Sequence, residues 1–260
     1  MFNKPKKRLG QVFLKNKHIQ EKIAQHVLSI ESDCLVEIGP GTGAITKYIY
    51  ETSGDKLILI EIDYQLISYL NTTFPLSKVI HNDFLEVDFS FIEQDKRTLL
   101  FGNIPYYITS LIILKFLKEP IFKEAIFMVQ KEFFETVTAK PKTNKYSSVS
   151  ALVQTFTRVK KLLDVDKKHF YPIPKVDSAV IHLTKEFNKD IDLDEYALFL
   201  RKCFAMPRKT LWNNLRKHFP EEKIKDLFES KEIYMNSRSD ELSSEFLVEI
   251  FNFLSDKKSS

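Results

Sequence analysis

Short apolar runs alternate with amphipathic segments over the first two thirds of the chain. A run of about four to eight mostly apolar residues bounded by turn residues is typical of a strand buried on both faces, and apolar residues spaced three or four apart are typical of a helix. The predicted strands lie at 34–39, 56–63, 78–84, 97–107, 124–130 and 178–185, and the predicted helices at 19–28, 44–51, 66–70 and 110–117. Strands that alternate with helices indicate βαβ units and a mostly parallel sheet.

The pattern changes after Lys185. Residues 188–193 are acidic and loop-like, and four amphipathic segments follow, at 196–204, 210–219, 222–228 and 245–254. We therefore predict an α/β domain over residues 1–187 and a small all-helical domain over residues 188–260.

Composition excludes several classes of protein. The chain has 260 residues of which 43% are hydrophobic, so it can bury a sizeable core, and no segment has the ~20 apolar residues of a membrane span. The basic start of the chain lacks the apolar run of a secretory signal. Cys34 and Cys203 are the only cysteines, which is too few for a disulfide framework or a metal-ligand set. We expect a cytoplasmic protein without a metal, and a monomer, because no coiled-coil pattern or spare apolar face is present.

The net charge of +4 is mild, but the cations are clustered. Residues 1–18 and 201–217 contain lysines and arginines and no acid. Such clusters favour a polyanionic partner, although a solvated lysine-rich surface would give the same pattern. The cations are Lys4, Lys6, Lys7, Arg8, Lys15 and Lys17 in the first cluster, and Arg201, Lys202, Arg208, Lys209, Arg216 and Lys217 in the second.

A glycine-rich loop, Gly39-Pro-Gly-Thr-Gly43, follows the first predicted buried strand and precedes a helix. Glycines let the backbone approach a ligand closely, and Glu61, at the end of the next strand, can accept hydrogen bonds from ribose hydroxyls. Asp83, after the third strand, suits the amino edge of adenine. The pattern predicts a nucleoside site for NAD or S-adenosylmethionine; the remaining alternative is a tight turn without a ligand.

The segment Asn103-Ile-Pro-Tyr106 follows another predicted strand, so it lies at the sheet edge where α/β folds bind ligands. The lone pair of an adenine amino group is delocalised into the ring, and methylation requires acceptors that favour a pyramidal nitrogen. The Asn103 side chain and the carbonyl of Ile104 or Pro105 can supply them, and the Tyr106 ring can stack on a flipped base. Taken alone, the segment could be an ordinary turn.

In order and spacing, the motifs of nearly the whole chain resemble the rRNA adenine N6-dimethyltransferases, and most closely the KsgA/RsmA group that modifies 16S rRNA. The segments that carry the resemblance are KRLGQVFL (7–14), EIGPGTGAIT (37–46), IEID (60–63), NDF (82–84), GNIPYYIT (102–109), VQKE (129–132), FYPIPKVDSAVIHL (170–183), RKTLWNNL (208–215) and RSDELS (238–243).

The resemblance implies a Rossmann-like, seven-stranded methyltransferase sheet with a helical C-terminal domain. It also implies that the enzyme transfers two methyl groups from S-adenosylmethionine to each of two adjacent adenosines near the 3′ end of 16S rRNA, within an immature small subunit. The implied cofactor-binding residues are Gln11, Val12, Leu14, Gly39, Gly41, Glu61, Ile62, Asp83, Phe84 and Asn103. The implied catalytic residues are Asn103, Pro105, Tyr106 and Phe170, the last as a second stacking ring, and the implied RNA-binding residues are Lys6, Lys7, Arg8, Arg208, Lys209 and Arg216.

The chain departs from the family pattern at three places. Val12 stands where Asn or His is usual, Pro207 replaces the first of two paired arginines, and residues 146–150 lack the usual arginine. The first departure removes a side-chain contact to the cofactor or the RNA, and the other two remove charges that would face RNA.

Three other functions stay open at this point. An Erm-type enzyme would methylate the large-subunit rRNA, a transcription or assembly factor of the same fold would act without chemistry, and an NAD oxidoreductase would share only the glycine pattern. The PKVDSAV segment and the two C-terminal motifs favour the 16S enzyme over the Erm type.

Overall fold

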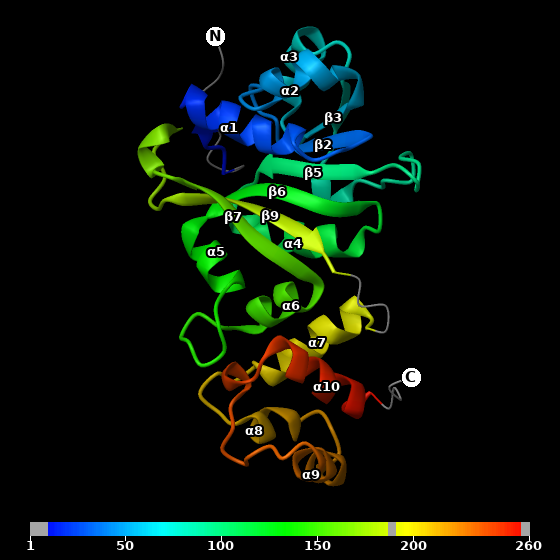
Figure 1. Ribbon diagram of the computed structural model, residues 1–260, viewed down its shortest axis with the longest axis vertical. Helices are drawn as coiled ribbons and strands as arrows, with labels where there is room; N and C mark the ends of the chain where they lie inside the picture. The colour runs from blue at the N-terminus through cyan, green and yellow to red at the C-terminus, as the bar shows by residue number, and fades with distance from the viewer. Residues whose placement is uncertain (1–9, 187–190, 256–260) are drawn as a thin grey trace. The chain divides into compact units, whose positions relative to one another are not determined.

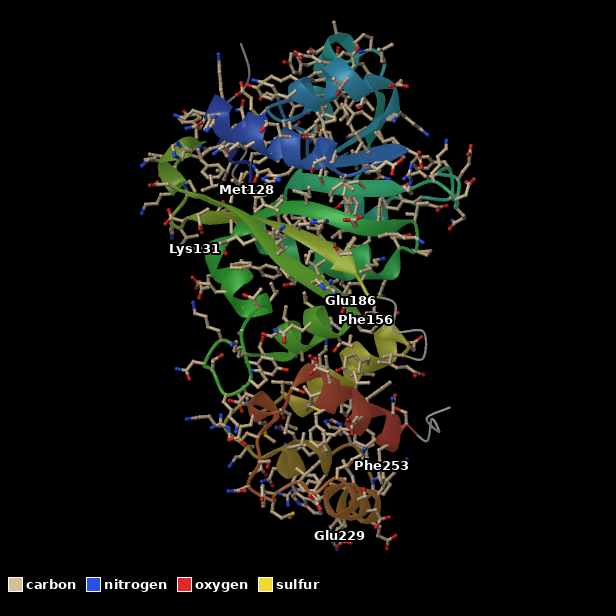
Figure 2. The ribbon with its side chains drawn as sticks, viewed as in Figure 1. Met128, Lys131, Phe156, Glu186, Glu229 and Phe253 are labelled. Carbon is tan, nitrogen blue, oxygen red and sulfur yellow. The ribbon has the colours of Figure 1, made fainter. Side chains whose placement is uncertain are left out.

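The computed structural model describes residues 10–186 and 191–255, and these form two compact units. The first unit contains the described residues up to Phe134 and Lys160–Lys185, and the second contains Glu135–Val159 and the described residues from Glu186 onward. Where the chain leaves and re-enters the second unit, Glu186 N–H donates to the carbonyl of Phe156 at 2.8 Å (Figure 2). The predicted boundary near residue 187 lies close to the last crossing, but the sequence pattern gave no sign that residues 135–159 group with the second unit.

The first unit is built on a seven-stranded sheet, with the strand order β4-β3-β2-β5-β6-β9-β7 (Figure 1). Neighbouring strands from β4 to β6 are parallel, and β9 is antiparallel to β6, so the predicted mostly parallel sheet is confirmed. The strands are β2 (Cys34–Ile38), β3 (Leu57–Glu61), β4 (Lys78–His81), β5 (Thr98–Asn103), β6 (Phe122–Gln130), β7 (Thr157–Val165) and β9 (Ser178–Lys185). All but β7 match predicted strands; β7 was missed because several of its residues are charged and it has no regular alternation.

Both faces of this sheet are buried, which explains the continuous apolar runs. The helices on one face are α1 (Lys17–Leu28), α2 (Thr46–Ser53) and α3 (Tyr64–Thr73), and α4 (Thr109–Lys118) lies on the other (Figure 1). Alternate strand residues such as Leu57 and Leu59 join the core under the first group of helices. A further helix, α5 (Lys131–Val137), and short 3-10 turns η2 (Gly54–Lys56), η3 (Phe84–Glu86) and η4 (Tyr106–Ile108) complete the connections.

The strand order fixes where a ligand can bind. From β2 the chain proceeds to β3 and β4 on one side, whereas β5 lies on the other side of β2. A crevice therefore opens outside the carboxyl ends of β2 and β5. Because β9 runs antiparallel to β6, its first residue, Ser178, pairs with Gln130 at the same edge.

A two-stranded ribbon lies beside this edge and was not predicted. Strand β1 (Phe13–Leu14) pairs antiparallel with β8 (Phe170–Tyr171), and the turn η5 (Lys167–His169) precedes β8. Two residues per strand are too few to give a periodic signal. The ribbon brings the GQVFL segment next to the glycine loop.

The second unit is helical. Its helices are α6 (Ser148–Phe156), α7 (Leu193–Cys203), α8 (Leu211–Leu215), α9 (Glu221–Ser230) and α10 (Ser244–Leu254), with the short turn η6 (Ser239–Glu241). The four helices predicted after residue 190 are present, although α8 is shorter than expected. Tyr196, Phe199 and Phe251 pack against one another in its core. In the described part of the chain, no helix is both long and apolar enough to cross a membrane.

Candidate active site

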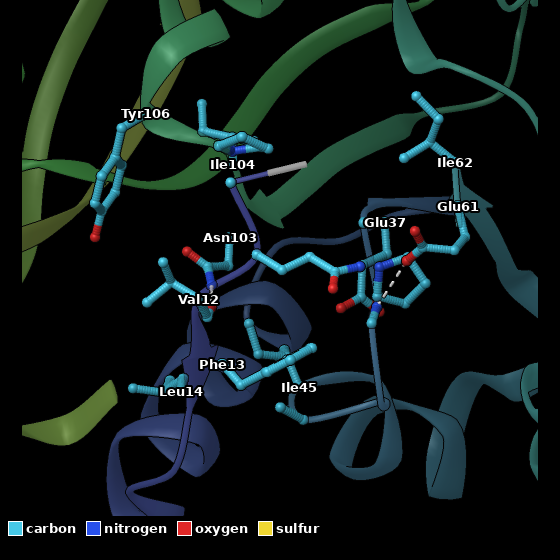
Figure 3. Close-up of a pocket in the computed structure, with 17 residues that line it drawn as sticks. Val12, Phe13, Leu14, Glu37, Ile45, Glu61, Ile62, Asn103, Ile104 and Tyr106 are labelled. Carbon is cyan, nitrogen blue, oxygen red and sulfur yellow. Dashed lines mark hydrogen bonds between the residues drawn. The ribbon is translucent and has the colours of Figure 1, made fainter. Parts of the chain in front are cut away.

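A pocket opens at the carboxyl ends of β2, β3 and β5 (Figure 3). Its empty volume is about 810 Å³ when the space at the open mouth is included. Most of the predicted cofactor-binding and catalytic residues line it. They are Gln11, Val12, Leu14, Gly39, Gly41, Glu61, Ile62, Asn103, Pro105 and Tyr106.

The glycine loop forms one wall and holds a carboxylate in place. Gly41 N–H donates to Glu61 Oε2 at 3.0 Å, and Asp63 N–H donates to Oε1 at 2.8 Å. Gly41 has φ +58°, and a Cβ there would lie 3.2 Å from the Phe13 ring, so another residue would be both strained and crowded. Burial raises the pKa of Glu61. A carboxylate has about four acceptor positions, so the oriented Glu61 can still accept from a ligand.

A second carboxyl group, that of Glu37, lines the pocket and was not predicted as a site residue. Glu37 lies inside the apolar run of β2 rather than at the end of a strand or in a loop. A single acid within such a run was the sequence feature that could have pointed to it. Thr46 Oγ1 donates to its Oε2 at 2.6 Å. Complete burial raises the pKa of Glu37 to about 8, and the nearby charge of Glu61 acts in the same direction.

These groups make the pocket suitable for a cationic nucleoside. Two buried carboxyl groups line it, and none of its described lining residues is a lysine or arginine. Ile62 is 47% exposed and gives the mouth an apolar edge on which a base or ribose can pack. The sulfonium and ammonium groups of S-adenosylmethionine suit a pocket whose described lining residues offer carboxyl groups and no basic side chain, whereas the diphosphate of NAD would find no cation among them.

The Asn103 amide is oriented by the main chain of the residue that precedes the ribbon. Its Nδ2 donates to the carbonyl of Val12 at 2.9 Å (Figure 3). A carbonyl can only accept, so the amino end of the amide must face Val12 and Oδ1 remains available as an acceptor. The unusual side chain at Val12 therefore leaves this backbone contact intact.

The carbonyl groups of Ile104 and Pro105 differ in whether they already accept a hydrogen bond from the protein. The carbonyl of Pro105 accepts from Ile108 N–H at 3.2 Å and from Thr109 Oγ1 at 3.3 Å. Among the described residues no donor is bonded to the carbonyl of Ile104. Of the two carbonyls considered from the sequence, that of Ile104 is thus the better candidate acceptor.

The Tyr106 ring stands at the pocket wall with its hydroxyl anchored. Its Oη lies 2.6 Å from Ser178 Oγ at the start of β9. Burial raises the pKa of Tyr106, so the phenol stays protonated at neutral pH. The anchor fixes the position of the hydroxyl end of the ring at the pocket wall.

Three predicted site residues do not line the pocket. Asp83 Oδ1 accepts from Leu85 N–H at 2.9 Å and caps η3, and Phe84 packs against Phe89 in the core. Phe170 is 0% exposed and belongs to the core cluster under α1, opposite Leu14 in the ribbon. The structure therefore does not bring Phe170 to a position where it could stack on a base in this pocket.

The predicted RNA-binding cations fall into two groups. Lys6, Lys7 and Arg8 lie outside the described residues. Arg208, Lys209 and Arg216 are exposed on the second unit: Arg208 and Lys209 lie in the turn that leads into α8, and Arg216 follows the end of that helix.

Two motif residues hold this turn in shape. Asn214 accepts from Met206 N–H at 3.0 Å, and the Arg238 guanidinium donates to the carbonyl of Pro207. The carbonyl at the unusual Pro207 thus has a structural partner in the RSDELS motif.

Comparison with known proteins places these features in a family. The family model described as ribosomal RNA adenine dimethylase matches residues 2–256. A protein of Mycoplasmopsis pulmonis named ribosomal RNA small subunit methyltransferase A is 40% identical over 250 residues, which cover 95% of this chain and 97% of that protein. A crystal structure of a dimethyladenosine transferase from Plasmodium falciparum is 29% identical, with a TM-score of 0.76 over 92% of this chain and 95% of that one. The 23S rRNA methyltransferase ErmE is 23% identical with a TM-score of 0.68 over 94% of this chain and 99% of that one, which shows a shared fold.

Proposed function

The chain belongs to the ribosomal RNA adenine dimethylase family, and on that premise we propose that it dimethylates N6 of two adjacent adenosines in the 3′-terminal hairpin of 16S rRNA. The observation that carries the proposal is the Asn103 amide, whose acceptor oxygen is presented beside a pocket for a cationic nucleoside. As a family member the chain is an S-adenosylmethionine-dependent enzyme.

The cofactor is proposed to lie between the glycine loop and Gln11–Leu14. Glu61 would accept from the ribose, Ile62 would pack on the nucleoside, and Glu37 would face the positively charged part. S-adenosylmethionine, when bound, supplies an electrophilic methyl group on a sulfonium. The chain contributes a rigid cradle, because the Glu61 carboxylate is already held by two backbone N–H groups.

The target amine is proposed to be held by Asn103 and the Ile104 carbonyl. Two acceptors that bind the two N–H groups of N6 favour a pyramidal nitrogen, and its lone pair then points to the methyl group. The Tyr106 ring would stack on the base and fix its plane. No strong base is required, since the surplus proton can leave after the transfer, and most of the rate gain would come from positioning.

The small subunit is favoured over the large one as the source of the RNA. The relative from Mycoplasmopsis pulmonis that carries the small-subunit name is 40% identical, whereas ErmE, a large-subunit enzyme, is 23% identical. The exposed Arg208, Lys209 and Arg216 are proposed to contact phosphates, which would make the affinity depend on salt.

The test is methyl transfer to small subunits that lack the modification. We expect labelled methyl groups on two adjacent adenosines of 16S rRNA, located by mass mapping, and none on 23S rRNA. Asn103→Ala is expected to abolish transfer while S-adenosylmethionine binding is weakened but retained. Wild-type protein that binds the cofactor yet methylates neither rRNA would disprove the proposal, and a methyl group on 23S rRNA alone would favour the Erm-type alternative.

A further inference from the structure

We propose that the Tyr171 ring stacks on the base of a nucleotide next to the target adenosine, and that the lysines around it bind the adjoining phosphates. The inference rests on the proposed function, which it deepens by giving the RNA strand a path out of the pocket. It starts from the ribbon of β1 and β8, whose two faces have different neighbours.

The register of the ribbon places Tyr171 on its pocket side. Phe13 pairs directly with Tyr171, and Leu14 pairs with Phe170. Directly opposed residues of an antiparallel pair point to the same face, about 4.5–5.5 Å apart. Leu14 and Phe170 are buried in the core, whereas Phe13 is only partly buried and its ring lies against Gly41 of the glycine loop. Tyr171 therefore lies next to a pocket residue, and it is 53% exposed.

A cation confirms the orientation of the ring. Lys15 is two residues from Phe13, so it shares the same face, and its Nζ lies 5.5 Å from the centroid of the Tyr171 ring. An aromatic ring beside a lysine is the combination that binds single-stranded RNA, because the ring stacks on any base and the cation meets the phosphate.

The charges around Tyr171 suit a polyanion. Lys167, Lys168 and Lys175 are exposed, and the nearby acids are Asp166 and Asp177. Both acids are bonded to the backbone of η5: Asp166 Oδ1 accepts from Lys168 N–H at 2.8 Å and Asp177 Oδ1 from Lys167 N–H at 3.0 Å. The Asp166 carboxylate also pairs with Lys168 Nζ at 3.1 Å. With Lys15, four lysines stand against two aspartates.

The ribbon is held rigidly, so the ring is positioned before RNA arrives. Lys15 N–H donates to the carbonyl of His169 at 2.8 Å, and Asn16 Nδ2 lies 3.0 Å from His169 Nδ1. Rigid placement lowers the entropic cost of binding. Phe170 would have to leave the core to stack on a base, whereas Tyr171 needs no rearrangement.

The experiment compares three variants of the full-length protein. Tyr171→Ala removes the ring, and Tyr171→Phe keeps it. Phe91→Ala is the matched control, because Phe91 is a 42% exposed ring with Lys78 Nζ 3.8 Å from its centroid. Lys78 begins β4, so this pair lies at the sheet edge opposite the pocket.

The readouts are affinity for a 16S 3′-hairpin RNA that carries 2-aminopurine beside the target adenosine, cofactor affinity, and the KM for unmethylated subunits. We expect Tyr171→Ala to weaken RNA binding about 5- to 150-fold, to abolish the quenching of 2-aminopurine, and to raise the KM more than it lowers kcat. Tyr171→Phe and Phe91→Ala should behave like the wild type in all three.

Two results would overturn the inference. Wild-type RNA affinity in Tyr171→Ala would show that no base stacks there, and an equal loss of cofactor affinity would show that the ring only supports the ribbon. A wild-type protein that binds the hairpin but transfers no methyl group to unmethylated small subunits would contradict the proposed function instead, and the binding comparison would still decide the role of Tyr171.

Discussion

Replacing Gly102 with alanine should separate the two central strands directly beside the pocket. Gly102 lies in β5 opposite Ile38 of β2, and a Cβ there would be 2.5 Å from the carbonyl oxygen of Ile38 and 3.3 Å from its nitrogen. Ordinary contact begins near 3.4 Å, so the strands must move apart by about 0.9 Å. The obstacle is backbone, which cannot rotate away as a side chain can.

The consequences fall on both stability and rate. Overpacking of this kind costs about 1–3 kcal/mol of unfolding free energy. Gly102 precedes Asn103, and Ile38 precedes Gly39, so the same movement separates the Asn103 amide from the glycine loop. A displacement of about 1 Å between reacting groups costs on the order of 100-fold in rate.

Urea unfolding and single-turnover methyl transfer would measure the two effects. Gly54→Ala is the control, because the Cβ there would meet a side chain rather than backbone, the Tyr50 ring at 2.7 Å, and Tyr50 does not line the pocket. We expect Gly54→Ala to keep the wild-type transfer rate. If Gly102→Ala unfolded at the wild-type urea concentration and transferred methyl groups at the wild-type rate, the close approach of β2 and β5 would be wrong.

Three further variants test individual groups. Tyr106→Phe removes only the bond to Ser178 and should cost about 0.5–1.5 kcal/mol of stability, whereas Tyr106→Ala should also lose a stack of ~1–3 kcal/mol in RNA binding; equal RNA affinity in the two variants would contradict the stack. The folded-state pKa of Glu37 is raised from 4.5 to about 8, so its contribution to stability is full below pH 4.5 and is lost as the pH rises to 8. Unfolding free energy should therefore fall by up to about 1.4 kcal/mol per pH unit in that range through this group, and urea unfolding at pH 5.5 and 7.5 should show a smaller fall in Glu37→Gln; an unchanged fall would mean that Glu37 is already ionised. Replacing Arg208 and Lys209 with Gln should lower the slope of log affinity against log salt by about 0.7–0.9 per phosphate contact, and an unchanged slope would remove them from the RNA interface.

The elements that could be predicted are those with strong local signals. The buried strands around Val36 and Leu59 are short, mostly apolar runs, and α10 has a clear helical period. Strand β7 could not be predicted, because its pattern is mixed and its pairing partner β9 lies later in the chain. Residues 135–159 belong to the second unit because of long-range packing, and no local feature of their sequence indicates this.

The site residues, too, could be predicted only where a local sequence feature indicated them. Turn chemistry identified Gly41 and Asn103, since glycines and an Asn-x-Pro-Tyr segment after strands are local features. Glu37 was missed because a single acid in an apolar strand indicates burial without saying what it faces. Phe170 was placed over the base by resemblance, whereas the alternation within a two-residue strand directs its ring into the core and Tyr171 outward.

The reversed strand β9 also bears on how the nascent chain is completed. Ser178, which anchors Tyr106, lies 72 residues later in the chain, so a ribosome has made the whole Asn103–Tyr106 loop long before its anchor emerges. Until β9 is synthesised, β6 is an uncovered sheet edge with the apolar stretch Ala125–Val129, and such edges pair with other chains. Truncated products that stop before residue 178 should therefore aggregate, and a premature stop codon there would give insoluble protein rather than a partly active enzyme.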